Sequence, residues 1–95
     1  MRLSQYEQKM IKESFHEVFH EGSITLFGSR VDDTIKGGDI DLYIQTPLLN
    51  ATLDKKIAFL VTLKEKIGDQ KIDVILSKDK NRLIEQEALQ KGIQL

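Results

Sequence analysis

Segments with the hydrophobic spacing of helices alternate along the chain with short apolar segments typical of strands. The expected order is helix, strand, short helix, strand, helix, strand, helix, at residues 4–20, 23–27, 29–34, 39–45, 52–67, 71–76 and 79–91. Alternation of this kind predicts an α/β protein in which helices pack on one small sheet. The pattern alone does not fix the directions of the strands.

Several expected helix ends carry residues that favour them. Ser4 and Glu7 have the spacing of a capping box at the start of the first helix. Gly22, Gly68 and Gly92 are expected to end the three long helices, because glycine readily adopts the backbone conformation that follows a helix. These signals support the predicted helices independently of their hydrophobic spacing.

Side-chain periodicity predicts which residues share a face. In the strand over 39–45, Ile40, Leu42 and Ile44 face one side, opposite Asp39, Asp41 and Tyr43. Helical spacing groups one set of residues in the second long helix, namely Leu53, Ile57, Leu60, Val61 and Lys64. It groups a second set in the last helix, namely Leu83, Ile84, Glu87 and Ala88. The apolar loop residues Leu48-Leu49 and the tail Ile93-Gln94-Leu95 are expected to cover the core.

Length and composition limit the classes of protein that fit. The chain has 95 residues, a net charge of −1 and no cysteine. We expect a single domain over residues 1–95, with room for one core and none for a separate substrate-binding domain. Balanced charge gives no basic footprint for DNA binding, and no segment has the apolar length of a membrane span. The N-terminus lacks the apolar stretch of a signal peptide, so a cytoplasmic location is expected.

Three aspartates carry the strongest indication of chemistry. Asp39 and Asp41 are two residues apart in a predicted strand, so they project from one face, roughly 6–7 Å apart along it. Asp73 lies in the strand-like segment that follows the second long helix. Carboxylates this close repel one another, and a hard cation such as Mg²⁺ relieves the repulsion. The alternative is a solvated polar face on a half-covered sheet.

A small loop precedes the acidic strand. Gly28-Ser29 lets the backbone approach a phosphate closely, and Arg30 is a candidate to bind phosphate charge. The alternative is a turn that merely ends a strand. Together with the aspartates, this loop indicates phosphoryl or nucleotidyl transfer with metal ions.

The segments Leu26-Phe27-Gly28-Ser29-Arg30, Gly38-Asp39-Ile40-Asp41-Leu42 and Ile72-Asp73-Val74 together resemble the minimal nucleotidyltransferases of the DNA polymerase beta superfamily. The resemblance covers about Ser23 to Leu76 and implies a mixed sheet with the acidic residues on its open face. It further implies that Asp39 and Asp41 ligate Mg²⁺, that Asp73 completes the metal site and helps to deprotonate the acceptor hydroxyl, and that Gly28, Ser29 and Arg30 bind the β,γ-phosphates of ATP or another nucleoside triphosphate.

The same resemblance implies a function. We expect Mg²⁺-dependent transfer of AMP from ATP to a hydroxyl on a partner protein, because so small a domain cannot enclose a large acceptor. Minimal nucleotidyltransferases are often paired with a helical HEPN-type toxin, for which this chain would be the antitoxin. The chain carries Asp32-Asp33 where many relatives have a second arginine, and Lys36 is a candidate to restore that charge.

Two other functions fit the sequence. The Asp32-Asp33 departure favours a nucleotide-binding module that neutralises its partner by binding and turns over little. A small-molecule nucleotidyltransferase, similar to the aminoglycoside-modifying enzymes and working as an oligomer, is the other alternative.

One further motif points to a different chemistry. His16-Glu17-Val18-Phe19-His20 matches the zinc-protease pattern H-E-x-x-H. Its context is wrong, because Val18 and Phe19 belong to the apolar face of a short helix. We expect an amphipathic helix and no stoichiometric zinc.

Overall fold

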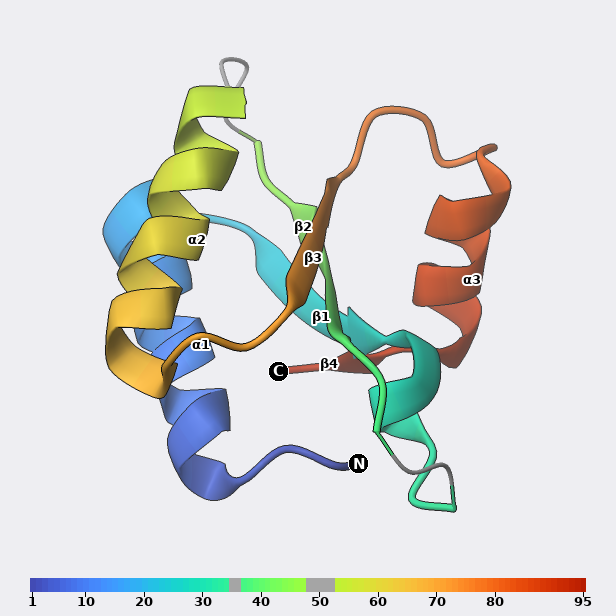
Figure 1. Cartoon of the computed structure of the whole chain (residues 1–95). Helices are drawn as coiled ribbons and strands as arrows, with labels where there is room; N and C mark the ends of the chain where they lie inside the picture. The colour runs from blue at the N-terminus through green and yellow to red at the C-terminus, as the bar shows by residue number, and fades with distance from the viewer. Residues whose placement is uncertain (35–36, 48–52) are drawn as a thin grey trace.

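The computed structural model describes residues 1–34, 37–47 and 53–95 (Figure 1). Its elements are α1 (Gln5–Phe19), β1 (Ser23–Phe27), the 3₁₀ helix η1 (Gly28–Val31), β2 (Ile40–Gln45), α2 (Leu53–Ile67), β3 (Ile72–Leu76), α3 (Leu83–Lys91) and β4 (Ile93–Gln94). The expectations for Lys36 and for Leu48-Leu49 lie outside the described residues. No described helix has the length and apolar character that crossing a membrane requires.

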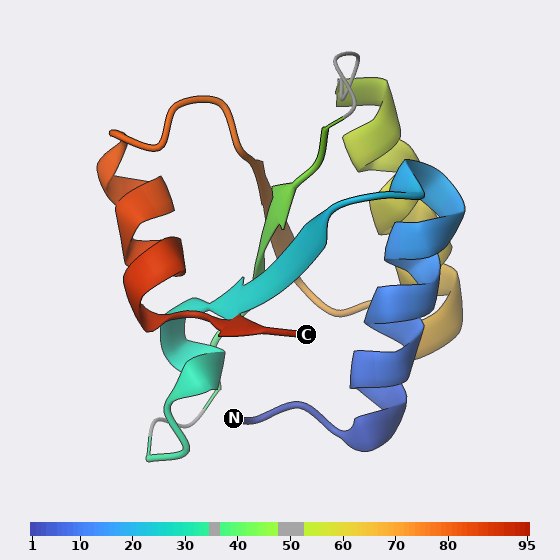
Figure 2. The ribbon, with the colours of Figure 1, turned by 180° about the vertical axis from the view of Figure 1, so that it is seen from behind.

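The four strands form one mixed sheet in the order β3-β2-β1-β4. β1 pairs antiparallel with both β2 and β4, whereas β2 and β3 run parallel and are connected through α2. Figures 1 and 2 show α1 and α2 on one face of this sheet and α3 on the other. The α/β class and the mixed sheet predicted from the sequence are therefore confirmed.

Alternation along the strands creates two apolar clusters. The larger one lies between the sheet and the α1–α2 pair, and its fully buried members include Ile11, Phe19, Leu26, Leu42 and Phe59. The smaller one lies on the α3 side and contains Phe27, Tyr43 and Ala88. Ile40, Leu42 and Ile44 share the larger cluster, as their spacing predicted, and this leaves Asp41 on the other face with Tyr43.

The start of α1 is as predicted, but its end is not. Ser4 Oγ accepts the backbone N–H of Glu7, and Glu7 Oε1 accepts the N–H of Ser4, both at 3.0 Å. The helix ends at Phe19 rather than next to Gly22, because His20 takes a left-handed backbone with φ 68° and caps it. The predicted helix ran one residue further, to His20, because hydrophobic spacing does not reveal the backbone conformation of a capping residue.

The face that α2 buries differs from the predicted one. Phe59 and Leu63 are fully buried, and Phe59 packs near Phe19 of α1 with ring centroids 6.2 Å apart. Leu53, Ile57 and Val61, which the spacing had grouped together, are at least half exposed. Apolar residues occur on two neighbouring sides of this helix, so its spacing could not tell which side meets α1.

The C-terminal segment contains a strand that the sequence pattern did not reveal. Ile93 and Gln94 form β4 beside Leu26 and Thr25 and are exposed, so of the tail expected to cover the core only Leu95 packs against it. α3 starts at Leu83, not near Asp79. Its buried residues are Glu85 and Ala88, whereas Leu83 is 83% exposed.

Candidate functional site

Asp41 and Asp73 lie directly side by side in the structure. They are register partners in the parallel pair formed by β2 and β3. Both stand on the α3 face of the sheet, because they alternate with Leu42 and Val74 of the larger apolar cluster. The helix α3 covers this face in part, so the acidic face is less open than the resemblance implied. Two residues separated by 32 positions in the sequence therefore form one acidic pair.

Gly28 lies against this pair from the end of β1. Phe27 is opposite Asp41 in the β1–β2 ladder, and the chain then turns at Gly28 with φ +75°. A Cβ atom on Gly28 would stand 2.4 Å from Asp41 Oδ2. Glycine is required here both for the backbone conformation and for the space beside the carboxylate.

These residues line a pocket of about 550 Å³ between the sheet, α2 and α3. Lys56 of α2 and Glu87 of α3 add a cation and a third carboxylate, and Ile84 adds apolar surface. Neither Lys56 nor Glu87 was singled out in the sequence. Helical spacing placed Glu87 on one side of the last helix but gave it no role, and each of the two residues reaches the pocket only through the packing of its helix against the sheet.

The electrostatics of the pocket favour a bound cation. Partial burial raises the pKa of Asp41, and the negative charges of Asp73, Asp39 and Glu87 raise it further, against a smaller opposing effect of Lys71. The raised pKa shows that the neighbouring carboxylates repel one another. A bound cation would relieve this repulsion and stabilise the ionised forms.

The donor chemistry fits Mg²⁺. Among the described residues, no cluster of three or more His, Cys, Asp or Glu side chains is arranged to hold a metal ion. Mg²⁺ does not require such a cage, since it commonly takes one or two carboxylates and completes its shell with water and substrate phosphates. The paired, mutually repelling oxygens of Asp41 and Asp73 meet that requirement.

The remaining predicted site residues, Asp39, Ser29 and Arg30, do not line this pocket. Asp39 precedes β2, contributes to the field at Asp41, and forms an ion pair with Lys71 at 3.5 Å. Ser29 lies inside η1, which begins at Gly28 and ends at Val31, so the short helix predicted over 29–34 starts earlier and is shorter than expected. The guanidinium of Arg30 donates to the carbonyls of Gly38 at 3.3 Å and Arg2 at 2.9 Å. Arg30 thus stabilises the loop in this structure.

Arg2 provides a second guanidinium beside the loop, which the sequence gave no reason to expect. It donates to the carbonyl oxygens of Ser29, Asp32 and Gly37, with Gly37 at 2.6 Å. The carboxylate of Asp32 accepts both the backbone N–H and the hydroxyl of Thr34. These hydrogen bonds lower the pKa of Asp32 and engage its carboxylate within the turn.

Gly28→Ala is expected to weaken Mg²⁺-ATP binding by about tenfold or more, because the new methyl group would displace the Asp41 carboxylate. Gly37→Ala is the matched control, since Gly37 has φ +73° and open space around the Cβ position. Calorimetric titration of both variants measures the difference. Equal affinities of the two variants for Mg²⁺-ATP would contradict the expected clash between the new Cβ atom at position 28 and the Asp41 carboxylate, and would leave backbone strain as the shared cause.

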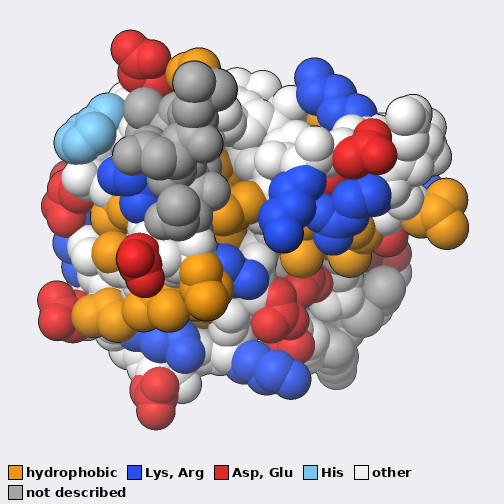
Figure 3. Space-filling view, turned by 90° about the horizontal axis from the view of Figure 1, so that it is seen from above, with side chains coloured by type: hydrophobic (Ala, Val, Ile, Leu, Met, Phe, Trp, Pro, Cys, Tyr) orange, Lys and Arg blue, Asp and Glu red, His pale blue; other side chains and the backbone are white. Residues whose placement is uncertain are grey.

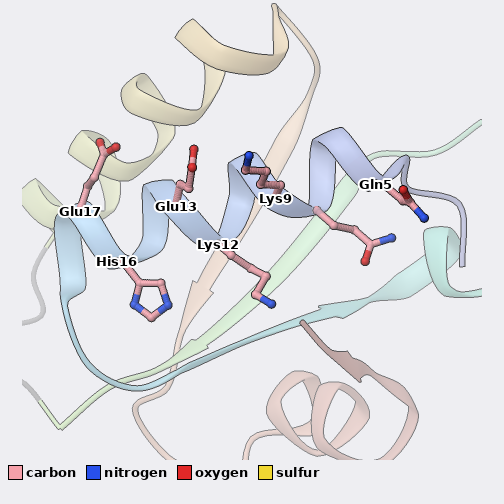
Figure 4. Close-up of a pocket in the computed structure, with 7 residues that line it drawn as sticks. Gln5, Lys9, Lys12, Glu13, His16 and Glu17 are labelled. Carbon is pink, nitrogen blue, oxygen red and sulfur yellow. The ribbon is translucent and has the colours of Figure 1, made fainter.

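The H-E-x-x-H motif does not form a converging site. His16 lies on α1 among the residues of a shallow groove along that helix, whereas His20 lies beyond the helix end (Figure 4). In Figure 4, the side chains of Glu17 and His16 point in different directions.

We therefore expect less than one zinc per chain in protein purified without a histidine tag. Elemental analysis of the wild type and of His16→Ala checks this. One bound zinc that disappears in the variant would overturn the expectation.

The geometry described above agrees with the comparison with known families. No curated protein matches the chain. The family model described as "Polymerase beta, Nucleotidyltransferase" matches residues 9–95, a segment that includes the Gly28 loop and all three aspartates. A match over so much of the sequence shows that the chain belongs to this nucleotidyltransferase family.

Proposed function

We propose that this protein is a Mg²⁺-dependent nucleotidyltransferase that moves AMP from ATP to a hydroxyl of a partner protein. The observation that carries this proposal is the register pair of Asp41 and Asp73 beneath Gly28. An acidic pair next to a glycine that leaves the backbone uncovered by a side chain is the arrangement that phosphoryl chemistry with hard cations needs.

Each residue has a distinct part in the proposed reaction. Asp41, with Asp39 beside it, would hold Mg²⁺, which supplies charge neutralisation at the phosphates when bound. Asp73 is more exposed than Asp41, so it can accept the proton of an incoming hydroxyl. Gly28 would let the triphosphate approach the backbone, because glycine carries no side chain and any Cβ at this position would collide with the Asp41 carboxylate.

The proposed acceptor is a protein, because among the described residues only the sheet, α2 and α3 line the pocket. Transfer to a hydroxyl in preference to water needs a wall that excludes water from the α-phosphate. A small helical partner of HEPN type would provide that wall, and modification of one of its tyrosines would make this chain an antitoxin.

A nucleotide-binding module that neutralises its partner by contact is the second candidate. The guanidinium of Arg30 is engaged by two backbone carbonyls, so it is less available for a triphosphate than the resemblance implied. Weak triphosphate binding would limit turnover and leave binding to the partner as the activity.

Intact-mass spectrometry of a co-expressed partner tests the proposal. We expect a nucleotide-sized mass increase with the wild type and none with the Asp39→Asn, Asp41→Asn double variant. Asp73→Asn should reduce the rate of transfer by about a hundredfold or more while keeping most of the ATP binding. Asp69→Asn, at an exposed position after α2, controls for the loss of a carboxylate elsewhere.

The outcomes separate the candidate functions. Neutralisation of the partner by both wild type and double variant, without a mass increase, supports the binding module. Adenylylation of a small molecule by the isolated protein supports the alternative that resembles the aminoglycoside-modifying enzymes, acting as an oligomer.

A further inference from the structure

The outer edge of β3 is open. β3 is the last strand of the sheet and pairs only with β2 among the described strands. The Ser77 N–H donates to the Ile44 carbonyl, and the Ile40 N–H donates to the Lys71 carbonyl. Backbone groups alternate in direction along a strand, so those of Ile72, Val74 and Leu76 point away from β2. An edge of this kind is a template for pairing with another extended chain.

A groove of about 440 Å³ lies along the same edge. Its apolar lining is formed by Leu53, Val74, Ile75 and Leu76. Its charged lining is entirely basic and comes from Lys56 of α2 and from Lys78 and Arg82, which flank the loop before α3. Figure 3 shows basic side chains gathered on this face beside a group of acidic ones. The groove therefore combines an apolar floor with a cationic rim in a chain whose net charge is negative.

This groove adjoins the pocket that contains Asp41 and Asp73. Lys56, Val74 and Ile75 line both, so the two hollows are direct neighbours along β3. Along β3, Leu76 at the basic end is three residues from Asp73 at the acidic end, which is roughly 10 Å of strand. A ligand that lies along β3 would contact the basic groove and present a reacting group at the acidic pocket.

The loop that carries the basic residues is held in place by a buried carboxylate. Glu85 is fully buried and accepts the backbone N–H groups of Lys78 and Asp79 at 3.1 and 2.9 Å. It also forms an ion pair with Arg82 at 3.3 Å. The side chain of Lys78 has no ion pair or hydrogen bond with a described residue, so its charge remains available for a ligand.

We propose that the groove binds an extended acidic peptide segment, which adds to the edge of β3 and brings its hydroxyl residue to Asp73. The assignment of this peptide as the acceptor rests on the proposed transferase function. Extended backbone fits the unpaired strand edge, and carboxylates fit the basic rim. The spacing predicts acidic residues two to four positions from the acceptor hydroxyl, on the side that lies towards Lys78.

A synthetic seven-residue peptide tests the binding step without metal or nucleotide. The peptide alternates glutamate with valine on one side of a tyrosine, and a second peptide has lysine in place of each glutamate. We expect the acidic peptide to shift the NMR signals of the Val74 and Leu76 amides, and the basic peptide not to bind. The double variant Lys56→Gln, Lys78→Gln should bind the acidic peptide about tenfold more weakly, because two ion pairs with the peptide are lost. Lys78→Gln alone should also weaken binding, whereas Lys80→Gln, which removes one charge from the same loop but outside the groove, should not.

Backbone pairing is tested on the peptide itself. N-methylation at the alternate residues that face β3 should abolish binding, whereas N-methylation at the intervening residues should preserve it. Equal binding of the two N-methylated peptides, or equal weakening by Lys78→Gln and Lys80→Gln, would overturn the proposal. So would tighter binding of a single-stranded oligonucleotide that competes for the same lysines.

The double variant Asp39→Asn, Asp41→Asn separates this inference from the proposed function. It should bind the acidic peptide as the wild type does. Peptide binding by both proteins, with no nucleotidyl transfer to peptide or partner by the wild type, would leave the groove assigned and refute the transferase function. Transfer to a partner whose acceptor segment does not bind the groove would refute the inference alone.

Discussion

Asp41→Asn is expected to abolish Mg²⁺-dependent ATP binding while slightly raising the stability of the metal-free protein. The folded pKa of Asp41 lies above its ordinary value of 3.8, because of partial burial and the neighbouring charges of Asp73 and Asp39. The stability contributed by the neutral form is therefore present below about pH 4 and is lost as the pH rises through the folded pKa. At neutral pH, replacing the Asp41 carboxylate by an amide removes a negative charge that its neighbours repel, and it also removes a metal ligand.

Calorimetry with Mg²⁺-ATP and thermal unfolding at pH 7 measure the two effects on the same variant. Asp69→Asn serves as the control in both experiments. An Asp41→Asn protein with wild-type affinity for Mg²⁺-ATP would remove Asp41 from the site. A strong loss of stability would instead show that the Asp41 carboxylate holds the fold together.

Glu85→Ala is expected to destabilise the protein by about 3 kcal/mol or more. The carboxylate of Glu85 is fully buried and accepts the hydroxyls of Tyr43 and Ser77, each at 2.8 Å. It also accepts two backbone N–H groups from the loop before α3. Alanine would leave these donors without their partner inside the protein. Glu85→Gln keeps the size of the side chain and should lose less, since only the charge and part of the acceptor capacity are removed.

The same residue predicts a dependence of stability on pH. Burial raises the pKa of Glu85, but the backbone N–H groups of Asp79 and Lys78 and the hydroxyls of Ser77 and Tyr43 outweigh it and lower the pKa to about 2. The ordinary value is 4.5, so the ionised form stabilises the fold above that pH by about 3 kcal/mol. This stability should be lost as the pH falls from 4.5 towards 2.

Chemical denaturation at pH 7 and at pH 3 checks this window. The free energy of unfolding of the wild type should fall more steeply between these values than that of Glu85→Gln. Parallel pH profiles for the two proteins would show that Glu85 is not the group that titrates.

The parts of the site that were predicted correctly depend on residues that lie close together in the sequence. Alternation placed Asp41 on the face opposite Leu42, and the structure confirms that placement. The glycine after β1 marked a backbone position that other residues adopt only with strain, and Gly28 has φ +75°. Strand β1 was predicted with its observed bounds, because its apolar run ends at a residue that interrupts it.

The register between strands could not be obtained in this way. Asp73 is the partner of Asp41 only because α2 crosses over and returns β3 parallel to β2. The same holds for Lys56 and Glu87, which reach the pocket from two different helices. Their positions depend on how each helix rotates against the sheet. Hydrophobic spacing leaves that rotation open when apolar residues occupy two sides, as Leu53, Ile57 and Val61 show in α2.

Glu85 shows the same division between local pattern and packing. A glutamate in a helix is normally solvated, and nothing near it in the sequence indicates burial. It is buried because Tyr43 and the loop before α3 surround it with donors that no helical period encodes. The sequence by itself determined the order of elements up to α3, the acidic strand and the glycine loop, since these depend on residues close together in the chain. Only the tertiary structure decided which charges meet, because strand register and helix rotation are set by packing over the whole core.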